Sequence, residues 1–519
     1  MEALDWLVIG VFFLALIGII VWVVRQKQND SADYFLGGRD ATWLAIGASI
    51  FASNIGSEHL IGLAGAGASS GMAMAHWEIQ GWMILILGWV FVPFYSRSMV
   101  YTMPEFLERR YNPQSRTILS VISLVSYVLT KVAVTVYAGG LVFQQVFGIK
   151  ELWGIDFFWI AAIGLVVLTA IYTIFGGMKS VLYTSVLQTP ILLLGSLIIL
   201  VLGFKELGGW DEMMRVCGAV TVNDYGDTMT NLIRSNDDAN FPWLGALIGS
   251  AIIGFWYWCT DQFIVQRVLS GKNEKEARRG TIFGAYLKLL PVFLFLIPGM
   301  IAFALHQKYI GAGGEGFLPM LANGTANADA AFPTLVAKLL PAGVKGLVVC
   351  GILAALMSSL ASLFNSSAML FTIDFYKRFR PETPEKKLVG IGQVATVVIV
   401  ILGILWIPIM RSVGDVLYTY LQDVQSVLAP GIAAAFLLGV CWKRTSAQGG
   451  MWGLISGMVI GLTRLGAKVY YSNAGEVADS TFKYLFYDMN WLFFCGWMFL
   501  FCMIVVIVVS LTTKAPTAE

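Results

Sequence analysis

The sequence has little charge and few of the groups that bind metals or carry out catalysis. Only 13% of its 519 residues are Asp, Glu, Lys or Arg, which is about half the share in an average soluble domain. Its three histidines and six cysteines are scattered and match neither a zinc site nor a disulfide framework. It also shows no nucleophile elbow in the strand–turn–helix context that this motif needs, and no phosphate-binding loop. We therefore expect no enzyme activity and no organic cofactor, and a net charge of +2 gives no reason to expect a nucleic acid partner.

Long hydrophobic runs are abundant. Residues of hydrophobic type make up 57% of the chain, and apolar stretches of about 20 residues recur from Trp6 to Ser510, the length that crosses a bilayer as a helix. The first run is followed at once by Arg25 and Lys27, so we expect it to be an uncleaved span. The pattern predicts an all-α polytopic membrane protein of about 13 spans. They begin near Trp6, Ala41, Ala73, Ile118, Phe157, Val181, Phe241, Gly280, Pro341, Leu388, Val413, Met451 and Asn490.

The loops between these spans differ in basic residues. One set holds about 21 Lys and Arg and the other about 10, and the richer set is cytoplasmic by the positive-inside rule. The N-terminus is then outside and the C-terminus cytoplasmic. The two longest loops, about 205–241 and 307–340, face outward. We expect a multi-pass plasma membrane protein, of the bacterial inner membrane because the chain is compact and its tail short.

Two predicted spans are interrupted by polar residues. The second contains FASNIGSEH and the seventh contains FWYWCTDQFIVQR. Each is the first of five consecutive spans, and broken helices at matching positions of two halves are typical of inverted-repeat transporters. The pattern therefore predicts a LeuT-type five-plus-five inverted repeat with flanking helices. Its parts are 1–40 (flanking helix and loop), 41–205 (first repeat), 206–240 (outer loop), 241–441 (second repeat) and 442–519 (flanking helices and tail).

Small and polar residues in membrane helices can also serve packing alone. We favour that interpretation for AGAGASSG, which begins at Ala64. Asn54, Glu58, His59 and Asp261 exceed what packing requires, because ionisable groups in a membrane are costly and usually functional. A break in the helix near Ile55 would also free backbone carbonyls, which is tolerated where the backbone lines a cavity or binds an ion. Glu58 itself receives no assigned role.

Further polar side chains lie deep in predicted spans. Glu78 and Lys288 are each about two turns into a span, although Lys288 could also reach the cytoplasmic edge. A cavity holding both is near neutral, which suits an uncharged, hydroxyl-rich solute that needs donors and acceptors. Ser358 and Ser359 are adjacent hydroxyls. They could simply bond to carbonyls of their own helix, or coordinate a small hard cation; calcium is disfavoured because no carboxylate cage accompanies them.

At these residues the sequence resembles the sodium/solute symporter family, and within it the sodium/glucose cotransporters. The matching stretches run in family order over about residues 34–444. They are FASNIGSEHLIGLAG, WYWCTDQFIVQR, GAYLKLLP, LMSSLASLFNSSAMLFTIDFY and APGIAAAFLLGVCWKR. The resemblance implies the inverted-repeat fold, a co-transported sodium ion as the only cofactor, and import of a neutral hexose such as glucose or galactose by alternating access.

The resemblance also implies roles for individual residues. For sodium it implies Ala52, Ile55, Ala355, Ser358 and Ser359. For the sugar it implies Asn54, His59, Glu78, Lys288 and Gln422, with Trp256 and Gln425 beside it. For the gates it implies Tyr257 on the inner side and Leu63, Trp77 and Tyr418 on the outer side, although aromatic residues at helical spacing are equally common in an ordinary core.

One position departs from the family pattern. Where sugar transporters usually carry Thr-Asp, with the aspartate linked to a second sodium site, this chain has Thr184 and Ser185. We therefore expect one sodium per sugar. Two alternatives stay open: the same fold could transport inositol, a sialic acid or an amino acid, or it could form a sugar-gated sodium channel or sensor. The expected partners are the solute and the lipid bilayer, and the expected state is a monomer or weak homodimer.

Overall fold

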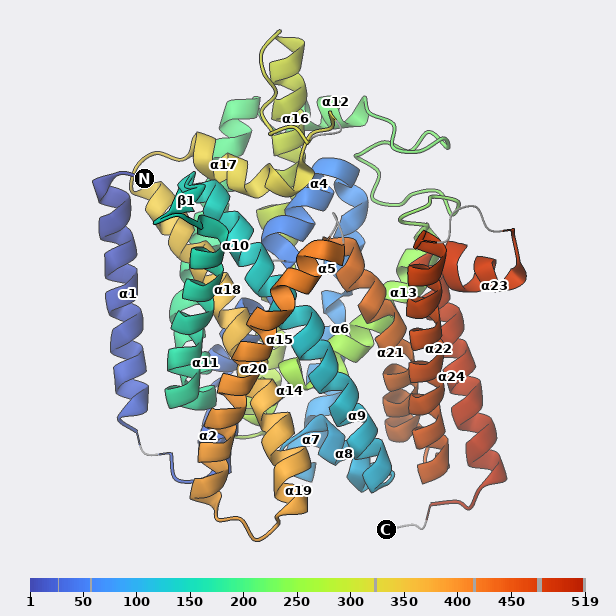
Figure 1. Ribbon diagram of the computed structural model, residues 1–519. Helices are drawn as coiled ribbons and strands as arrows, with labels where there is room; N and C mark the ends of the chain where they lie inside the picture. Colours follow the sequence, from blue (N-terminus) through green and yellow to red (C-terminus); the bar gives the residue numbers. More distant parts are fainter. Residues whose placement is uncertain (27, 57, 322–323, 414–416, 474–477, 517–519) are drawn as a thin grey trace.

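The computed structural model is a bundle of long helices with little other structure (Figure 1). It describes residues 1–26, 28–56, 58–321, 324–413, 417–473 and 478–516, and among these it describes the side chains except at 129, 409–423 and 472–473. Ten helical runs of the described part are long and apolar enough to cross a membrane. The start of α1 and the end of α24 lie at opposite ends of the bundle, as an odd number of crossings requires.

The elements of the first half follow the predicted spans. The α-helices are α1 (Ala3–Val24), α2 (Ser31–Leu36), α3 (Trp43–Asn54), α4 (Ala64–Ser70), α5 (Ala75–Ile79), α6 (Met83–Ile86), α7 (Val92–Ser98), α8 (Met103–Arg110), α9 (Pro113–Ser126), α10 (Ala133–Phe147), α11 (Phe157–Leu207) and α12 (Trp210–Gly218). Short 3₁₀ or π-helical turns join them: η1 (Gly37–Arg39), η2 (Glu58–Leu63), η3 (Gly71–Met74), η4 (Gln80–Trp82), η5 (Leu87–Phe91) and η6 (Tyr127–Val132). Strands β1 (Glu151–Leu152) and β2 (Ile155–Asp156) form a small hairpin between α10 and α11.

The second half is built in the same way. Its α-helices are α13 (Trp243–Gly254), α14 (Gln262–Leu269), α15 (Glu274–Leu287), α16 (Ile297–Gly311), α17 (Ala331–Leu339), α18 (Val344–Met369), α19 (Lys377–Phe379), α20 (Glu385–Val413), α21 (Leu417–Cys441), α22 (Ala447–Asn473), α23 (Thr481–Lys483) and α24 (Trp491–Thr512). Its short turns are η7 (Phe255–Thr260), η8 (Val292–Leu296), η9 (Ala328–Ala330), η10 (Leu370–Tyr376) and η11 (Tyr484–Asp488).

Both predicted breaks are present. Helix α3 ends at Asn54, and Ile55 is extended, with φ −77° and ψ 102°. In the other half η7 ends at Thr260, and Asp261 is extended, with φ −74° and ψ 128°. The Asp261 carboxylate then caps α14 by accepting a hydrogen bond from the backbone N–H of Phe263. Each break replaces helical hydrogen bonds by side-chain contacts inside the bundle, where a polar backbone needs partners.

The two broken helices run in opposite directions. The backbone N–H of Ala41, just before α3, donates to the carbonyl of Ser270, just after α14, over 2.9 Å. The N–H of Lys272 donates back to the carbonyl of Ala41 over 3.1 Å. The beginning of the first broken helix therefore lies beside the end of the second, which is the antiparallel relationship that an inverted repeat requires.

A glycine divides the longest helical run into two crossings. Gly177, within α11, has φ 53° and ψ −149°, a conformation that only glycine adopts without strain. A β-carbon at this position would lie 2.4 Å from the backbone oxygen of Tyr34. The run of 51 residues thus supplies the two separate spans that the sequence predicts near Phe157 and Val181.

The structure also shows what the first long loop, which is predicted to face outward, covers. The backbone N–H of Met72, in the turn after α4, donates to the carbonyl of Met229 over 2.7 Å. The guanidinium of Arg234 donates to the carbonyl of Ser70. This loop therefore closes over the turn between the second and third spans, directly beyond the first broken helix.

Candidate functional site

The first break brings α3 against α18. The hydroxyl of Ser359 donates to the backbone carbonyl of Ser53 over 2.6 Å, and a β-carbon on Gly56 would lie 2.8 Å from the same hydroxyl. A helix that ends leaves the carbonyls of its last turn without helical partners. Hydroxyls and freed carbonyls therefore converge at this contact, a ligand set that suits a hard monovalent cation. The five residues assigned to sodium are all buried: Ala52, Ile55, Ala355, Ser358 and Ser359.

A cluster of serines surrounds one arginine beside this contact. The Ser53 hydroxyl lies 2.8 Å from that of Ser362, and the Ser185 hydroxyl lies 3.3 Å from that of Ser358. The guanidinium of Arg267 donates to Ser53 over 2.7 Å and to Ser49 over 3.1 Å. Among the residues described, no carboxylate comes within ion-pair distance of Arg267. The arginine is therefore a buried positive charge held by hydroxyls.

The deep acidic and basic residues of the predicted sugar site form one cluster. Nζ of Lys288 lies 2.6 Å from a carboxylate oxygen of Glu78 and 2.8 Å from Nε2 of His59. The other carboxylate oxygen of Glu78 lies 3.1 Å from the same ring nitrogen. All three side chains are buried, with Lys288 3% exposed, so Lys288 does not reach the membrane edge. This arrangement is a neutral set of donors and acceptors.

These residues line a small cavity between the two broken helices. Asn54 donates from its amide to the hydroxyl of Tyr257 over 3.0 Å and so joins the two breaks. The cavity has a volume of about 20 Å³, room for about one water molecule. The lining residues are Asn54, Glu58, His59, Trp77, Glu78, Gln80, Ile253, Tyr257, Trp258, Lys288 and Gln425. In this shape the site is closed around its own polar groups.

The remaining predicted site residues lie at different places. Trp256 and Leu63 are buried but are not among the residues that line the cavity. Trp77 lines it and also packs edge-on against Trp491, with 5.6 Å between the ring centroids. Gln422 and Tyr418 lie outside the described side chains.

Several residues at the site were not predicted from the sequence. Gln80 and Trp258 line the cavity, yet nothing in their spacing distinguishes them from ordinary helix residues. Lys131 is different, because a lysine inside a predicted span, in SYVLTKVAV, is itself a signal. Its Nζ lies 2.7 Å from a carboxylate oxygen of Asp261, at the second break. Glu58, to which the sequence analysis assigned no role, lines the central cavity and also a second cavity next to Ser359.

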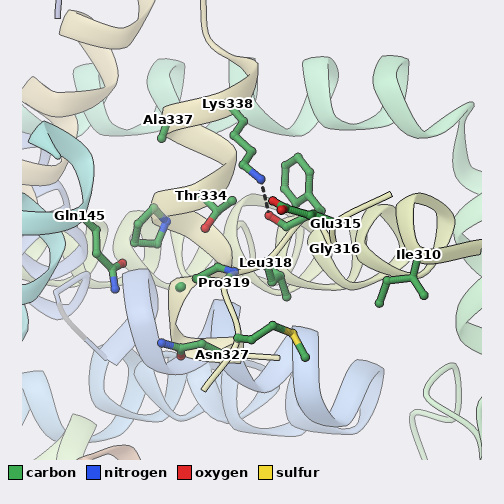
Figure 2. A pocket seen from close by; sticks show the side chains of 14 residues that line it. Gln145, Ile310, Glu315, Gly316, Leu318, Pro319, Asn327, Thr334, Ala337 and Lys338 are labelled. Atoms are coloured by element: carbon green, nitrogen blue, oxygen red, sulfur yellow. Dashed lines mark hydrogen bonds between the residues drawn. The ribbon is translucent and has the colours of Figure 1, made fainter. Parts of the chain in front are cut away.

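A larger cavity lies among the outer segments. It measures about 720 Å³ and is bounded by the end of α16, α17 and the segment between them (Figure 2). Lys338 donates to the backbone carbonyl of Phe317 across it, over 2.7 Å. Its lining comes largely from this outer segment and contains none of the residues at the two breaks. We therefore place the functional site at the smaller, central cavity.

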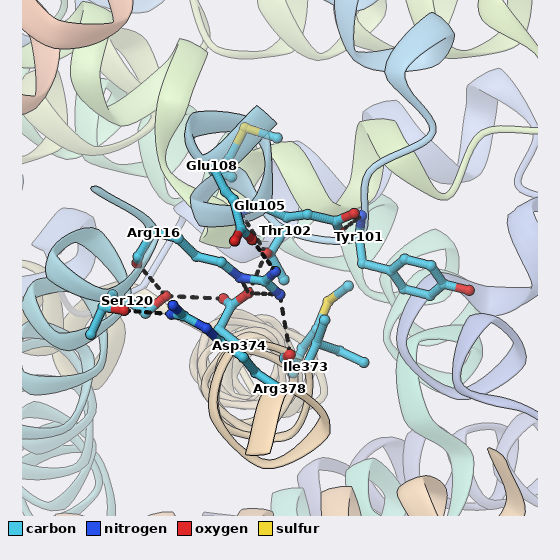
Figure 3. A network of polar contacts seen from close by, with 12 residues as sticks. Tyr101, Thr102, Glu105, Glu108, Arg116, Ser120, Ile373, Asp374 and Arg378 are labelled. Carbon is cyan, nitrogen blue, oxygen red and sulfur yellow. Dashed lines mark hydrogen bonds and ion pairs between the residues drawn. The ribbon is translucent and has the colours of Figure 1, made fainter. Parts of the chain in front are cut away.

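At the opposite end of the bundle, Asp374 forms the centre of a polar network (Figure 3). Its carboxylate accepts from the Arg116 guanidinium over 2.7 Å and from the Thr102 hydroxyl over 2.8 Å. Its second oxygen accepts from the Ser120 hydroxyl over 3.1 Å. Arg116 also bonds Glu108 over 2.6 Å. The network holds the segment before α8 and the start of α9 against η10.

Comparisons with known proteins identify the family and the fold. The model of the sodium:solute symporter family matches residues 34–457. The whole chain is 36% identical to the sodium/myo-inositol cotransporter 2 of Homo sapiens, of which the match covers 78%, and 37% identical to the sodium/glucose cotransporter 1 of Ovis aries, of which it covers 80%. A solved structure of a Na⁺-coupled sialic acid symporter in a substrate-bound, outward-open state matches with a TM-score of 0.79 at 22% identity, covering 99% of each chain.

The chain therefore belongs to the sodium:solute symporter family. The structural likeness confirms the predicted LeuT-type inverted repeat with flanking helices. The protein is a multi-pass membrane carrier that couples a solute to sodium, and it is not an enzyme.

Proposed function

We propose that this symporter imports a neutral, polyhydroxylated ring, a hexose such as glucose or galactose, together with sodium. The observation that carries the proposal is the buried cluster of Glu78, Lys288 and His59 facing Asn54 and Tyr257 across one small cavity. The charges of Glu78 and Lys288 offset each other, so this cluster favours no ionic solute, whereas a ring of hydroxyls can replace each internal contact by a bond of its own.

In this proposal each group keeps the role expected from the sequence. Asn54, His59, Glu78, Lys288 and Gln422 bond the sugar, with Trp256 and Gln425 beside it. Sodium is held by the carbonyls of Ala52, Ile55 and Ala355 and the hydroxyls of Ser358 and Ser359. Tyr257 closes the inner side, and Leu63, Trp77 and Tyr418 close the outer side.

Coupling follows from the short first broken helix. Sodium on the carbonyls of Ala52 and Ile55 fixes the break, and with it Asn54 and His59, in the orientation that the sugar needs. The ion thereby raises the population of the sugar-competent state. At −100 mV one sodium moving inward contributes about 2.3 kcal/mol from the potential alone, and about 1.4 kcal/mol supports a tenfold accumulation.

We propose that one sodium accompanies each sugar. Ser185 donates to the carbonyl of Val181 over 2.6 Å and carries no charge. Its hydroxyl oxygen also lies 3.4 Å from that of Ser49, which accepts a hydrogen bond from the buried Arg267. Ser185 therefore offers a second sodium a hydroxyl in place of the carboxylate that the family pattern has at this position. The further parts of the proposal are a monomer or weak homodimer, the N-terminus outside, and repeats at 41–205 and 241–441.

A second candidate substrate is myo-inositol, which is named for the human relative. It is also a neutral ring of hydroxyls, so the same cavity chemistry suits it. What distinguishes it from a hexose is the absence of a ring oxygen and of an exocyclic hydroxymethyl group.

The deciding experiment is sodium-driven uptake into proteoliposomes with a panel of radiolabelled solutes: glucose, galactose, myo-inositol, a sialic acid and an amino acid. We expect uptake of a neutral ring, one charge moved per ring, and accelerated exchange when the vesicles are preloaded. Uptake of only the sialic acid or the amino acid would contradict the substrate class. Two charges per ring would contradict the stoichiometry. Sodium current without accelerated exchange would indicate a channel.

A further inference from the structure

Lys131 occupies the junction of the two broken helices. It lies in η6, is 5% exposed, and pairs with Asp261, the extended residue of the second break. The Tyr127 hydroxyl donates to the same carboxylate and accepts from the backbone N–H of Phe263. One turn of the fourth span therefore fixes the point where the second helix is broken.

The same ammonium also holds the ring of the inner gate. Nζ of Lys131 lies 4.6 Å from the ring centroid of Tyr257, and the rings of Phe263, Tyr127 and Trp256 follow at 5.0, 5.1 and 5.5 Å. A cation within about 6 Å of an aromatic ring is attracted to its face, more strongly where water is excluded. The Tyr257 hydroxyl in turn accepts a hydrogen bond from the side-chain amide of Asn54, so the contacts of Lys131 extend through Tyr257 to the first broken helix.

Lys131 also borders the place proposed for sodium. A cavity of about 10 Å³ lies between Lys131 and Ser359, and Ser53, Asn54, Gly56, Glu58 and Tyr257 contribute to its walls. Two positive charges in so small a buried space repel each other strongly, because little solvent screens them. The carboxylate of Glu58, which faces this cavity and the central one, is the group that offsets the added charge.

We propose that Lys131 is the positioning residue that couples sodium to the inner gate: it holds Tyr257 and the second break while the ion site is empty, and an entering sodium loosens that hold by repulsion. This inference rests on the proposed sodium-driven uptake and deepens it. It accounts for Glu58 as well, because a carboxylate shared by the two cavities stabilises sodium and a displaced ammonium together.

The test compares Lys131→Met, Lys131→Arg and the double variant Lys131→Met/Asp261→Asn in proteoliposomes, with Lys150→Met as a control for losing an exposed lysine. The readouts are the sodium concentration for half-maximal uptake and the rate of sodium leak without sugar. Rates are normalised to the amount of folded protein. Lys131→Met should bind sodium more tightly, on the order of tenfold for a removed like charge, and should leak. Lys131→Arg keeps the positive charge, so its half-maximal sodium concentration and its sodium leak should both match those of the wild type. The double variant leaves no buried aspartate without its cation. Its half-maximal sodium concentration should therefore return toward the wild-type value, while the sodium leak should remain.

A purely structural lysine would weaken sodium binding or leave it unchanged when removed. An unchanged half-maximal concentration with no leak in Lys131→Met would overturn the proposal, and so would an arginine variant that behaves like the methionine variant. If Lys131→Met does not fold, the arginine and double variants decide by the same criteria. A wild-type protein without sodium-driven uptake would instead refute the function on which the inference rests.

Discussion

The hydroxyl of Ser359 donates a hydrogen bond to the backbone carbonyl of Ser53 over 2.6 Å, and this bond joins α18 to the last turn before the first break. Because the same hydroxyl is proposed to bind sodium, Ser359→Ala should raise the sodium concentration for half-maximal uptake by about tenfold, the equivalent of one lost hydrogen bond. Sodium titration of uptake measures this. Ser367→Ala replaces a buried serine on the same helix whose hydroxyl has no hydrogen-bond partner among the described residues, and it should change little; an equal effect there would argue against the ion assignment.

Variants of the Glu78–Lys288 pair should affect stability and transport differently. Lys288→Met leaves a buried carboxylate without its cation and should cost about 3–5 kcal/mol of unfolding free energy, whereas replacing both partners by neutral residues should recover most of it. Thermal unfolding in detergent without substrate tests the single variant against Glu78→Gln/Lys288→Met. Uptake should be lost in both variants. Restored uptake in the double variant would show that neither residue is needed to bind the sugar.

The network in Figure 3 contains a buried and a partly exposed ion pair of the same arginine. The side chain of Asp374 is 0% exposed and that of Glu108 is 27% exposed. Asp374→Ala should therefore destabilise the protein by about 3 kcal/mol, and Glu108→Ala by less than about 1 kcal/mol. Denaturation of the two variants in the same detergent gives the comparison. Equal losses would show that burial does not control the strength of this network.

The outer loop should loosen only in acid. Burial alone would raise the pKa of Asp238, but hydrogen bonds from Phe241, Asn223 and Asn240 and the charge of Arg234 lower it below its ordinary value. A lowered folded pKa contributes stability above the unfolded pKa of about 3.9 and loses it as pH falls through the folded pKa. Hydrogen exchange in 219–242, corrected for intrinsic rates, should stay constant from about pH 7 to 5 and rise below about pH 4. Asp238→Asn should exchange faster already at neutral pH; a loop that loosens between pH 7 and 5 would contradict this assignment.

The breaks and the deep ionisable residues were visible in the sequence because the membrane makes them costly. Extended backbone at Ile55 and Asp261, and burial of Glu78 and Lys288, follow from polar residues inside apolar runs. The sequence also placed Glu78 and Lys288 in one near-neutral cavity, but their direct ion pair, with 2.6 Å between Nζ and a carboxylate oxygen, could not be predicted from it.

What the sequence could not provide are the pairings between distant spans. Lys131 and Asp261 are 130 residues apart, and no local pattern relates them. Two serines of the cluster around Arg267, Ser185 and Ser362, bond carbonyls of their own helix, as serines in membrane helices often do. Their second contacts exist only because α3, α11, α14 and α18 meet at one place, which depends on packing and not on periodicity.

The central cavity of about 20 Å³ has an osmotic consequence. A space that holds about one water molecule cannot support a continuous file of water across the bilayer. A cell that carries many copies of the protein in this closed shape gains no path for swelling or shrinking when the osmolarity changes. We therefore expect water to pass through this cavity only as the hydration that each turnover admits on one side and releases on the other, so that flow should scale with transport and stop with it.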